Sequence, residues 1–278
     1  MTAQTLRLTK AHGLGNDFLV ALASRNDQLT AATVAAGGAV AAKALCERHR
    51  GVGADGLIFG LPSSETDADL RMVLFNADGS EAEISGNGIR CLGQAALRAM
   101  GRRDGDIVID GASGRRRLTS IATDDPAVDQ LTVSMGTVGQ GPAIGPVASA
   151  VPAMHIGSGN VGNPHVVVHV ESLDDIDPAV AGPPIEAEVS GGTNVHFMAV
   201  TGADTIRLLH WERGSGVTEA RGSGATVSAR LARDWGLVGS RVTVQMPGGV
   251  AVVDVDEPMS LTGEAVHIAE IAVDDAWF

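Results

Sequence analysis

Short runs of apolar residues, many of them alternating with polar ones, recur along the chain and predict short β-strands. Gly, Asn and Asp separate the runs, as is typical of strands joined by tight turns. In the first half these runs are Leu6–Leu8, Phe18–Ala23, Leu57–Phe59, Leu70–Phe75, Ile107–Ile109 and Leu131–Met135. In the second half they are Val166–Val170, Val195–Val200, Thr205–Leu209, Val242–Met246 and Val250–Val255.

Three other segments predict helices. Apolar residues recur with helical spacing over Val34–His49, and glycines open the segments Asn87–Met100 and Ser223–Trp235. The segment Gly139–Pro152 is rich in Gly, Pro and Ala and predicts a surface loop. The chain is therefore expected to be an α+β protein.

The two halves of the chain repeat the same landmarks in the same order. Asn76 stands nine positions before the tetrad Ser85–Gly88, and Glu212 stands nine positions before the tetrad Arg221–Gly224. A predicted helix follows each tetrad. Repetition of ordered landmarks indicates a duplicated α+β unit. We expect one half to comprise residues 1–126 with 265–278, and the other to comprise residues 127–264.

Composition narrows the class of protein. The 278 residues are 44% hydrophobic, which is ample for a buried core, and the formal net charge of −13 argues against a nucleic-acid partner. The two cysteines, Cys46 and Cys91, form neither a disulfide framework nor a metal-type spacing. No signal-peptide pattern or membrane-spanning run is evident. These features predict a cytoplasmic protein that binds no nucleic acid and no membrane.

Each Gly-x-Gly tetrad offers a binding site for an anion. The first turn of a helix leaves backbone N–H groups unpaired, and glycine lets a ligand approach them closely. Gly86 and Asn87 on one helix, and Gly222 and Ser223 on the other, are therefore candidates to bind a carboxylate. The alternative is that both tetrads are ordinary caps, with Asn87 and Ser223 as the capping residues.

Amides and charges gather at the ends of the predicted strands. Asparagine is common in turns, so each residue alone could be structural. Together they suit a zwitterion: amides and a carboxylate for an ammonium group, and an arginine for a carboxylate. The residues concerned are Asn16, Asn76, Asn163, Asn194, Glu212 and Arg213.

Several segments resemble the diaminopimelate epimerase family, from near the N-terminus to about residue 235. They are Lys10–Phe18, Phe75–Glu81, Gly86–Cys91, Gly162–His165 and Trp211–Gly214. The resemblance implies two pseudo-symmetric β-barrel-like halves, each around a central helix, with the active site in the cleft between them. It also implies chemistry without pyridoxal phosphate, metal or any other cofactor.

The chain departs from that family at the two positions that carry its chemistry. The family uses two cysteines, one immediately before each Gly-x-Gly, to remove and return the α-proton. Those positions hold Ser85 and Arg221 here, and Cys91 matches a second, non-catalytic cysteine of the family. A serine hydroxyl needs a separate base, and an arginine stays protonated. We therefore do not expect epimerisation by two thiols.

Other roles follow for the candidate catalytic residues. Arg221 can hold a carboxylate, and Ser85 can donate a hydrogen bond or relay a proton. His165 is the leading candidate for the base, although it could be a structural histidine beside a turn proline. Glu219 is a second candidate, or it could only pair with Arg221. Further candidates for the base are His196, Asp78 and Glu83.

Two smaller departures concern the substrate. Val217 replaces a residue that is usually polar in the family, and Gly56 leaves no side chain where some members contact the substrate. Together they indicate a different distal group on the ligand.

Three functions stay open from the sequence. The first is an isomerase-type or related reaction at an α-carbon, by one-base isomerisation, elimination or cyclisation of an amino-acid-like substrate. The second is a non-catalytic homologue that binds an amino acid. The third is epimerisation by bases other than cysteine. A small amino-acid-like molecule is the expected partner, and a homodimer is left open.

Overall fold

The computed structural model describes residues 5–274, except residues 27, 83–84, 113, 147, 149–150, 215 and 219–221. The chain forms two compact units. Unit 1 comprises Met1–Val133 with Glu264–Phe278, and unit 2 comprises Ser134–Gly263. The sequence placed these boundaries after residues 126 and 264.

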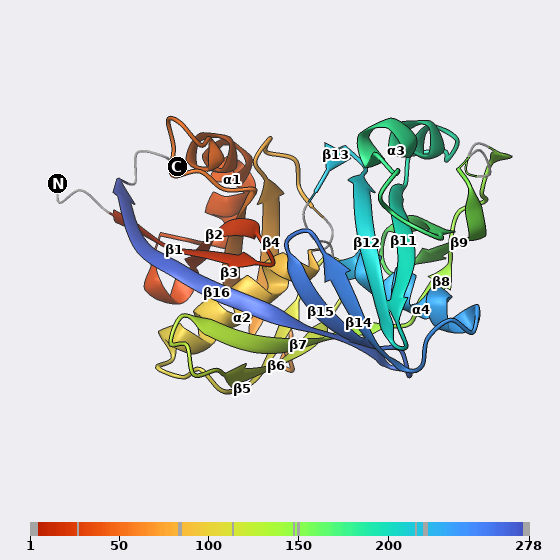
Figure 1. Ribbon diagram of the computed structural model, residues 1–278. Coiled ribbons are helices and arrows are strands. Elements are labelled where there is room, and N and C mark those ends of the chain that lie inside the picture. The colour runs from red at the N-terminus through yellow and green to blue at the C-terminus, as the bar shows by residue number, and fades with distance from the viewer. Residues whose placement is uncertain are drawn as a thin grey trace. The chain divides into compact units, whose positions relative to one another are not determined.

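The elements follow one another along the chain as strands interrupted by a few helices (Figure 1). From the N-terminus they are β1 (Thr5–Gly13), β2 (Asn16–Leu22), η1 (Ala23–Arg25), α1 (Ala31–Cys46), β3 (Gly56–Pro62), β4 (Leu70–Asn76), α2 (Gly86–Ala99), β5 (Gly105–Asp110), β6 (Arg116–Ala122) and β7 (Val128–Gly136). Then come β8 (Gly139–Gln140), β9 (Ala153–Asn160), β10 (Pro164–Val170), α3 (Pro178–Ala187), β11 (Asn194–Gly202), β12 (Thr205–Glu212), β13 (Gly216–Val217), α4 (Gly222–Asp234), β14 (Arg241–Met246), β15 (Gly249–Asp254) and β16 (Met259–Asp274).

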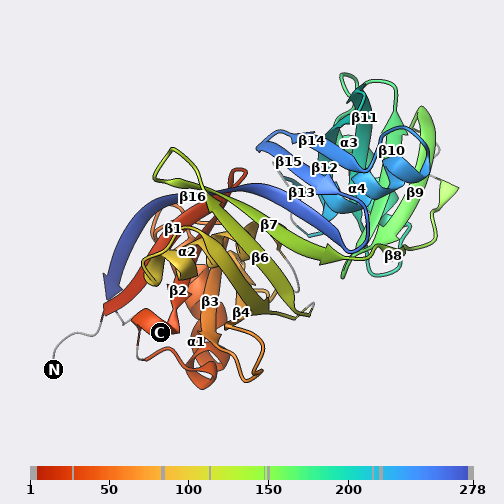
Figure 2. The same ribbon diagram turned by 90° about the horizontal axis from the view of Figure 1, so that it is seen from below.

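The strands of unit 1 form a closed barrel around α2. Their order is β1 to β7 in sequence, then β16, which pairs with β1 and closes the ring. Helix α2 packs against β1 to β6, and both Figure 1 and Figure 2 show the strands lying around it. Helix α1 packs against β3 and β4, where Phe59 and Leu45 belong to one hydrophobic cluster.

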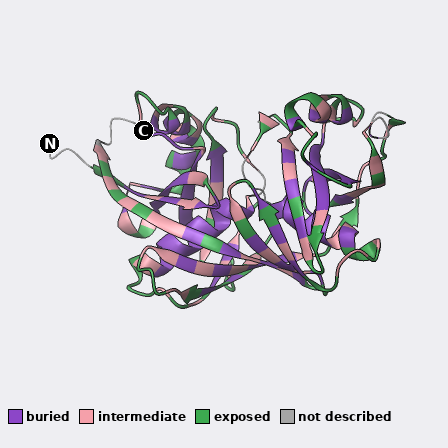
Figure 3. Ribbon diagram, viewed as in Figure 1, coloured by how far each residue is buried: buried purple, intermediate pink, exposed green. Residues whose placement is uncertain are grey.

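Small residues allow the barrel to enclose α2. Every residue from Gly86 to Leu97 is buried, as the purple of this helix in Figure 3 shows. A Cβ on Gly93 would lie 2.9 Å from Leu118 Cδ2, closer than real Cβ atoms approach their neighbours. The glycine therefore lets a strand side chain pack directly on the helix backbone, which explains why a helix of low hydrophobicity occupies the centre of the unit.

Unit 2 repeats this plan with a different helix. Its strands run in the order β8, β9, β10, β11, β12, β14, β15 and β16, and α4 packs against β9, β10, β11, β14 and β15. Gly222 to Ala229 are all buried. Along β10 the side chains of Val166 and Val168 belong to a hydrophobic cluster that includes Ile185 of α3. The alternate residues of β10, His165 among them, face the other side of the sheet.

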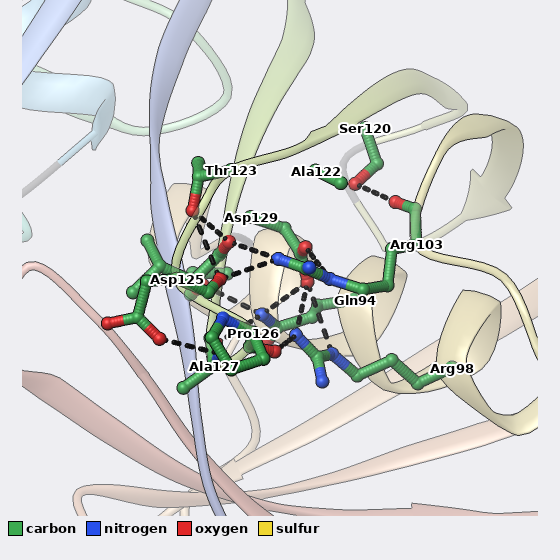
Figure 4. A network of polar contacts seen from close by, with 12 residues as sticks. Gln94, Arg98, Arg103, Ser120, Ala122, Thr123, Asp125, Pro126, Ala127 and Asp129 are labelled. Carbon is green, nitrogen blue, oxygen red and sulfur yellow. Dashed lines mark hydrogen bonds and ion pairs between the residues drawn. The ribbon is translucent and has the colours of Figure 1, made fainter.

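A buried carboxylate anchors the C-terminal half of α2 in unit 1. Asp129 on β7 accepts hydrogen bonds from Gln94 Nε2 at 2.8 Å, Arg98 Nη2 at 2.8 Å and Arg103 Nε at 2.8 Å (Figure 4). The two arginines also donate to backbone carbonyls of the loop at residues 125–128. The network therefore fixes α2 to the loop that leads into β7.

All the strands and helices predicted from the sequence are present, and the fold is α+β as expected. The strands β6, β8, β9, β13 and β16 were not predicted, nor was helix α3, which contains Pro183 and Pro184. Asp177 caps α3 and Pro178 occupies its first turn, where a proline loses no hydrogen bond. In its described part, the predicted surface loop at 139–152 contains the two-residue strand β8 and 3-10 conformation at Pro146 and Ala148. Among the described residues, no helix is long and apolar enough to cross a membrane.

Candidate functional site

In unit 1, the predicted site residues lie at one edge of the barrel, where α2 begins. Asn16 starts β2, and Asn76 ends β4 opposite Gly56, the first residue of β3. Gly13 lies against the helix, because a Cβ there would be 3.3 Å from Asn87 Cα. The register of β1 to β4 therefore brings these strand ends to the first turn of α2.

Ser85 is the N-cap of α2. Its Oγ accepts a hydrogen bond from Gly88 N at 2.9 Å, and this is its only side-chain partner among the described residues. The alternative that named Asn87 as the cap is wrong, because Asn87 lies inside the first turn. Among the described residues, no base contacts the Ser85 hydroxyl.

A line of hydrogen bonds orients the amides of this edge. The buried Arg90 guanidinium donates to Asn87 Oδ1 at 2.9 Å, Asn87 Nδ2 donates to Asn16 Oδ1 at 3.4 Å, and Asn16 Nδ2 donates to Asp55 Oδ2 at 2.7 Å. Arg90 also donates to the carbonyls of Gly86 and Glu264. Burial lowers the pKa of Arg90 to about 10. Arg90 and Asp55 are therefore positioning residues for the predicted amides.

Charged side chains fix the Asp55 end of this line. Arg48 Nη2 lies 2.9 Å from Asp17 Oδ1 and 2.7 Å from Asp55 Oδ1, and Lys10 Nζ lies 2.5 Å from Asp17 Oδ2. Burial raises the pKa of Asp17, but hydrogen bonds from Arg48 and Lys10 outweigh it and lower the pKa to about 2. Asp17 is therefore ionised at neutral pH, and Asn16 is held by a network with fixed charges.

Asn76 lies at the same edge of the barrel, but its side chain is hydrogen-bonded to a residue close to it in the sequence. Its Nδ2 donates to Ser80 Oγ at 3.0 Å, and its side chain is exposed. Asp78 accepts hydrogen bonds from the Ser80 hydroxyl at 2.6 Å and the Ser80 backbone N–H at 2.8 Å, which lower its pKa. A carboxylate with a lowered pKa is a weak base, so Asp78 is a poor candidate for proton removal.

In unit 2, the predicted residues also meet at one edge of the sheet. Asn163 precedes β10, Asn194 starts β11 opposite His165, and Glu212 ends β12. Asn194 Nδ2 donates to Pro164 O at 3.0 Å, and the backbone N–H of Arg213 donates to Asn194 Oδ1 at 3.2 Å. The buried Asn194 side chain therefore ties together the ends of β10 and β12.

Arg213 and Glu212 differ in exposure. The Arg213 side chain is exposed, and its Nη1 donates to Gly191 O at 3.2 Å. Glu212 is half-buried at the strand end. Both therefore remain at the surface of the unit, where a small zwitterion can reach them. Val217 on β13 pairs with Trp211 of β12 and is also exposed.

His165 belongs to a buried row of imidazoles. Its Nε2 lies 2.8 Å from Asn163 Oδ1, and its Nδ1 lies 2.8 Å from His196 Nε2. His196 Nδ1 in turn lies 3.0 Å from His210 Nδ1. All three histidines are fully buried, whereas Asn163 keeps 7% of its surface exposed. Both ring nitrogens of His165 are therefore engaged, and Asn163 is the more exposed end of the row.

The start of α4 is buried beside this row. Gly222 is the first residue of the helix and Ser223 the second, so Ser223 is not the cap. Glu83, Glu219 and Arg221 lie outside the described residues. The predicted positions of these three side chains therefore stay predictions.

The thiols and the potential metal ligands offer no alternative centre within the described part of the chain. Burial raises the pKa of both Cys46 and Cys91 to about 12, so neither is poised as a thiolate. No three His, Cys, Asp or Glu side chains of the described residues are grouped to hold a metal ion.

Sequence reasoning missed Arg90, Asp55 and His210 as parts of the site. Arg90 could have been found from its position three residues after Asn87 on the same helix face. His210 could have been found from the strand period, because it lies two residues before Glu212. Asp55 carried no comparable signal, since its partner Asn16 is distant in sequence.

Comparison with known proteins gives a consistent family match. The model of the diaminopimelate epimerase family matches residues 8–139 and 158–268. A diaminopimelate epimerase of Erythrobacter litoralis is 38% identical over 273 residues, covering 93% of this chain and 94% of that protein. One from Prochlorococcus marinus is 36% identical over 261 residues, covering 88% of this chain and 84% of that protein.

Solved structures share the fold at lower identity. A hydroxyproline epimerase from Agrobacterium vitis, with bound trans-4-hydroxy-L-proline, has a TM-score of 0.72 at 17% identity and covers 98% of this chain and 94% of its own. A phenazine biosynthesis protein of the PhzF family from Bacillus anthracis has a TM-score of 0.68 at 17% identity, covering 97% and 99%. The predicted fold class is confirmed by these likenesses.

Proposed function

Because the chain belongs to the diaminopimelate epimerase family, we propose that it is an isomerase-type enzyme acting on the α-carbon of a small amino-acid-like acid. Family and fold support an amino-acid epimerase or isomerase. The proposal is more specific: one-base isomerisation, elimination or cyclisation, without pyridoxal phosphate or metal, and not epimerisation by two thiols.

The observation that carries this proposal is the hydrogen bonding of the Ser85 hydroxyl. Its hydroxyl caps α2 and has no described base beside it, while the amides around it are oriented by Arg90 and Asp55. In this proposal, the edge of unit 1 binds and orients the ligand. The base in this proposal comes from unit 2.

In this proposal, binding groups in each unit are assigned to a part of an amino-acid-like ligand. Amides and the Glu212 carboxylate hold the ammonium group, and the N-terminal turns of α2 and α4 hold carboxylate oxygens. Arg221 adds a guanidinium to the second of these turns and stabilises negative charge that develops during the reaction. The binding residues are Asn16, Asn76, Gly86, Asn87, Asn163, Asn194, Glu212, Arg213, Gly222 and Ser223.

His165 is the proposed base, and the reaction begins when its Nε2 is released by Asn163. The Cα–H bond of the substrate breaks, the proton passes to Nε2, and the electron pair of the bond moves into the adjacent carboxyl group as an enolate. Arg221 and the helix N–H groups stabilise that charge, and Ser85 donates a hydrogen bond to it. Return of the proton to Cα gives exchange, and its delivery to another carbon gives isomerisation.

Exchange of the α-proton with solvent tests the proposal. The protein is incubated in D₂O with a panel of L- and D-amino acids and dicarboxylic amino acids, and deuterium at Cα is followed by NMR. One-base chemistry predicts exchange that retains configuration, or a shifted double bond or ring in the product. His165→Gln should slow the exchange by about 100-fold or more.

A second candidate, a non-catalytic amino-acid-binding protein, is favoured by one observation. The ring of His165 is fully buried and both of its nitrogens are already bonded, which is typical of a structural histidine. Calorimetric binding of an amino acid with neither exchange nor product would support this candidate. Exchange that disappears in His165→Gln while binding persists would exclude it.

A further inference from the structure

Helix α3 lies against the strand end that carries two of the predicted ligand-binding residues. The helix packs against β11, β12 and β13, and Glu212 is the last residue of β12, with Arg213 directly after it. Trp211 comes directly before Glu212 and pairs with Val217 of β13. The half-buried Trp211 side chain packs against the hydrophobic cluster that includes Ile185 of α3. Contacts that fix Trp211 therefore also fix the strand end beside Glu212.

Helix α3 contacts the Trp211 side chain in two ways. A Cβ on Gly182 would lie 2.3 Å from Trp211 Cγ, so the backbone of the helix rests directly on this side chain. At the edge of the ring, Trp211 Nε1 donates a hydrogen bond to Oε2 of the half-buried Glu186 at 2.6 Å. An indole has this one donor and no acceptor, and a carboxylate accepts more strongly than a neutral oxygen does. Glu186 therefore determines the orientation of the indole.

Glu186 also borders Arg213, which follows Glu212 in the sequence. A Cβ on Gly192 would lie 2.9 Å from Glu186 Oε1 and 2.9 Å from Arg213 Cδ, so both side chains lie against this glycine. Arg213 Nη1 donates to Gly191 O at 3.2 Å. Gly191 and Gly192 have φ values of 81° and 75°, a region that favours glycine, so the turn permits this close approach. The Glu186 carboxylate thus lies near the residues that precede and follow Glu212.

We propose that Glu186 is a positioning residue for ligand binding, which rests on the proposed roles of Glu212 and Arg213 as ligand-binding residues. By holding Trp211 and bordering Arg213, it keeps the end of β12 in one arrangement before the ligand arrives. Binding to a strand end that must first become ordered costs affinity, and a preorganised strand end avoids that cost. Glu186 itself does not touch the ligand in this proposal. Its loss should therefore weaken binding without slowing proton removal by His165 on β10.

Three variants isolate the hydrogen bond between the indole and the carboxylate. Glu186→Leu removes the acceptor and keeps a side chain of similar size, Glu186→Gln keeps an acceptor oxygen, and Trp211→Phe removes the donor. The matched control is Glu171→Leu, which makes the same change at an exposed position directly after β10. Hydrogen exchange of the α3 and β11 amides checks that unit 2 keeps its fold in each variant.

NMR signals of the protein without any ligand test the positioning. In Glu186→Leu, the Trp211 indole N–H signal should move upfield, because the proton loses its acceptor, and its exchange with water should quicken. The backbone amide signals of Glu212 and Arg213 should shift in the same variant. Glu186→Gln should retain most of the indole shift, and the indole signal of Trp235 should stay unchanged in both variants. Unchanged amide signals of Glu212 and Arg213 in Glu186→Leu would show that Glu186 does not hold the strand end, and would overturn the proposal.

Calorimetry with L-glutamate and LL-diaminopimelate tests the effect on binding. Glu186→Leu and Trp211→Phe should each weaken binding by about 10-fold. Glu186→Gln and Glu171→Leu should stay within about 3-fold of the unsubstituted protein. Because Glu186→Leu and Trp211→Phe break the same hydrogen bond, the variant that carries both should bind at most about 2-fold more weakly than either alone. Losses that multiply in this double variant would show that the two side chains act independently, and would overturn the proposal.

Kinetics of α-proton exchange separate the positioning role from the proposed function. Glu186→Leu should raise the KM by about 10-fold and leave kcat within about 2-fold, because a loss of uniform binding changes the KM alone. An unchanged KM in Glu186→Leu would overturn the positioning role while leaving the proposed function in place. Absence of both binding and exchange in the unsubstituted protein would instead refute the proposed function, and the amide signals would still decide whether Glu186 holds the end of β12.

Discussion

The two units hold an equivalent asparagine by different chemistry. In unit 1, Asn16 at the start of β2 is bonded to Asp55, whose carboxylate belongs to an ionic cluster with Arg48. In unit 2, Asn163 just before β10 is bonded to His165, the first ring of a row of three buried histidines. Charged side chains hold the first amide, whereas an imidazole ring holds the second. The duplicated plan thus uses different side chains for the same purpose in its two units.

The central helices of the two units are also anchored differently. Helix α2 is held at its C-terminal half by the buried Asp129, which accepts from two arginines. Helix α4 is held at its C-terminal half by more exposed pairs, Arg230 with Glu257 and Arg233 with Asp256. Removal of a buried carboxylate, or of its partners, strongly lowers the free energy of unfolding, because it leaves buried groups unpaired. An exposed ion pair contributes little to that free energy. We therefore predict that removal of one charged side chain lowers the stability of unit 1 more than that of unit 2.

Asp129→Ala should therefore have the largest effect on stability. The substitution leaves Gln94, Arg98 and Arg103 without their shared acceptor and should lower the free energy of opening of α2 by about 3 kcal/mol. Hydrogen–deuterium exchange of the α2 amides measures it. The matched control is Asp256→Ala, which should change the exchange of α4 by less than about 1 kcal/mol. Equal effects in the two units would contradict the comparison.

Arg221→Ala should have the next largest effect, on ligand binding rather than stability. If Arg221 donates charge-assisted hydrogen bonds to a carboxylate beside the first turn of α4, its loss should cost about 1.5–3 kcal/mol, or roughly 10- to 150-fold in affinity or turnover. Arg221→Lys should recover only part, because lysine lacks the planar fork. Calorimetry and turnover measure both variants, and equal affinity with equal turnover in Arg221→Ala would remove this residue from the site.

Acid should lower the stability of unit 1, because it protonates Asp17. Its pKa is lowered from 3.8 to about 2 on folding, so its contribution is fully present above pH 4 and is lost as the pH falls toward 2. Because Arg48 is partly exposed, the contribution is about 1–2 kcal/mol. Asp17→Asn should flatten the fall in unit 1 stability between pH 4 and pH 2, measured by urea unfolding with exchange detection. If the stability of unit 1 in Asp17→Asn falls between pH 4 and pH 2 as steeply as in the unsubstituted protein, this role of Asp17 is contradicted.

The smallest expected effect concerns unit 2 at milder pH. Burial, and then the neighbouring His155, lower the pKa of His169 below its ordinary 6.5. The unfolded chain therefore binds a proton more readily, and unit 2 loses stability as the pH falls below about 6.5. His169→Phe keeps a ring stacked on Trp235 and should reduce this loss. Unfolding followed by tryptophan fluorescence at pH 7 and pH 5 measures the loss of stability in the variant. A loss as large as in the unsubstituted protein would contradict this role of His169.

Local patterns in the sequence were sufficient for most of the fold. The strand runs and the glycine-led helices depend on short-range periodicity, so they could be predicted, and the repeated tetrads indicated the duplication. Helix α3 was missed because Pro183 and Pro184 normally interrupt a helix. Strand β9 was missed because glycine and asparagine weaken its pattern.

The site could be predicted less completely, because its contacts join residues distant in sequence. Asn16, Asn87 and Asn163 were expected from their positions at strand and helix ends, and His165 was expected from the resemblance to the family. Their partners could not be expected in the same way. The contact between Asn16 and Asp55 depends on the register of β2 and β3, and the contact between His196 and His210 depends on the register of β11 and β12. Register is a property of the folded sheet, not of either strand alone.

The interconversion of LL- and meso-diaminopimelate tests whether the protein lacks epimerisation by two thiols. The purified protein, and a double variant carrying Ser85→Cys and Arg221→Cys, are incubated with LL-diaminopimelate in D₂O and the stereoisomers are separated. We predict no inversion by the unsubstituted protein, because Ser85 and Arg221 cannot act as the two thiols, and some inversion by the double variant. Inversion by the unsubstituted protein with a kcat on the order of 10 per second would contradict it.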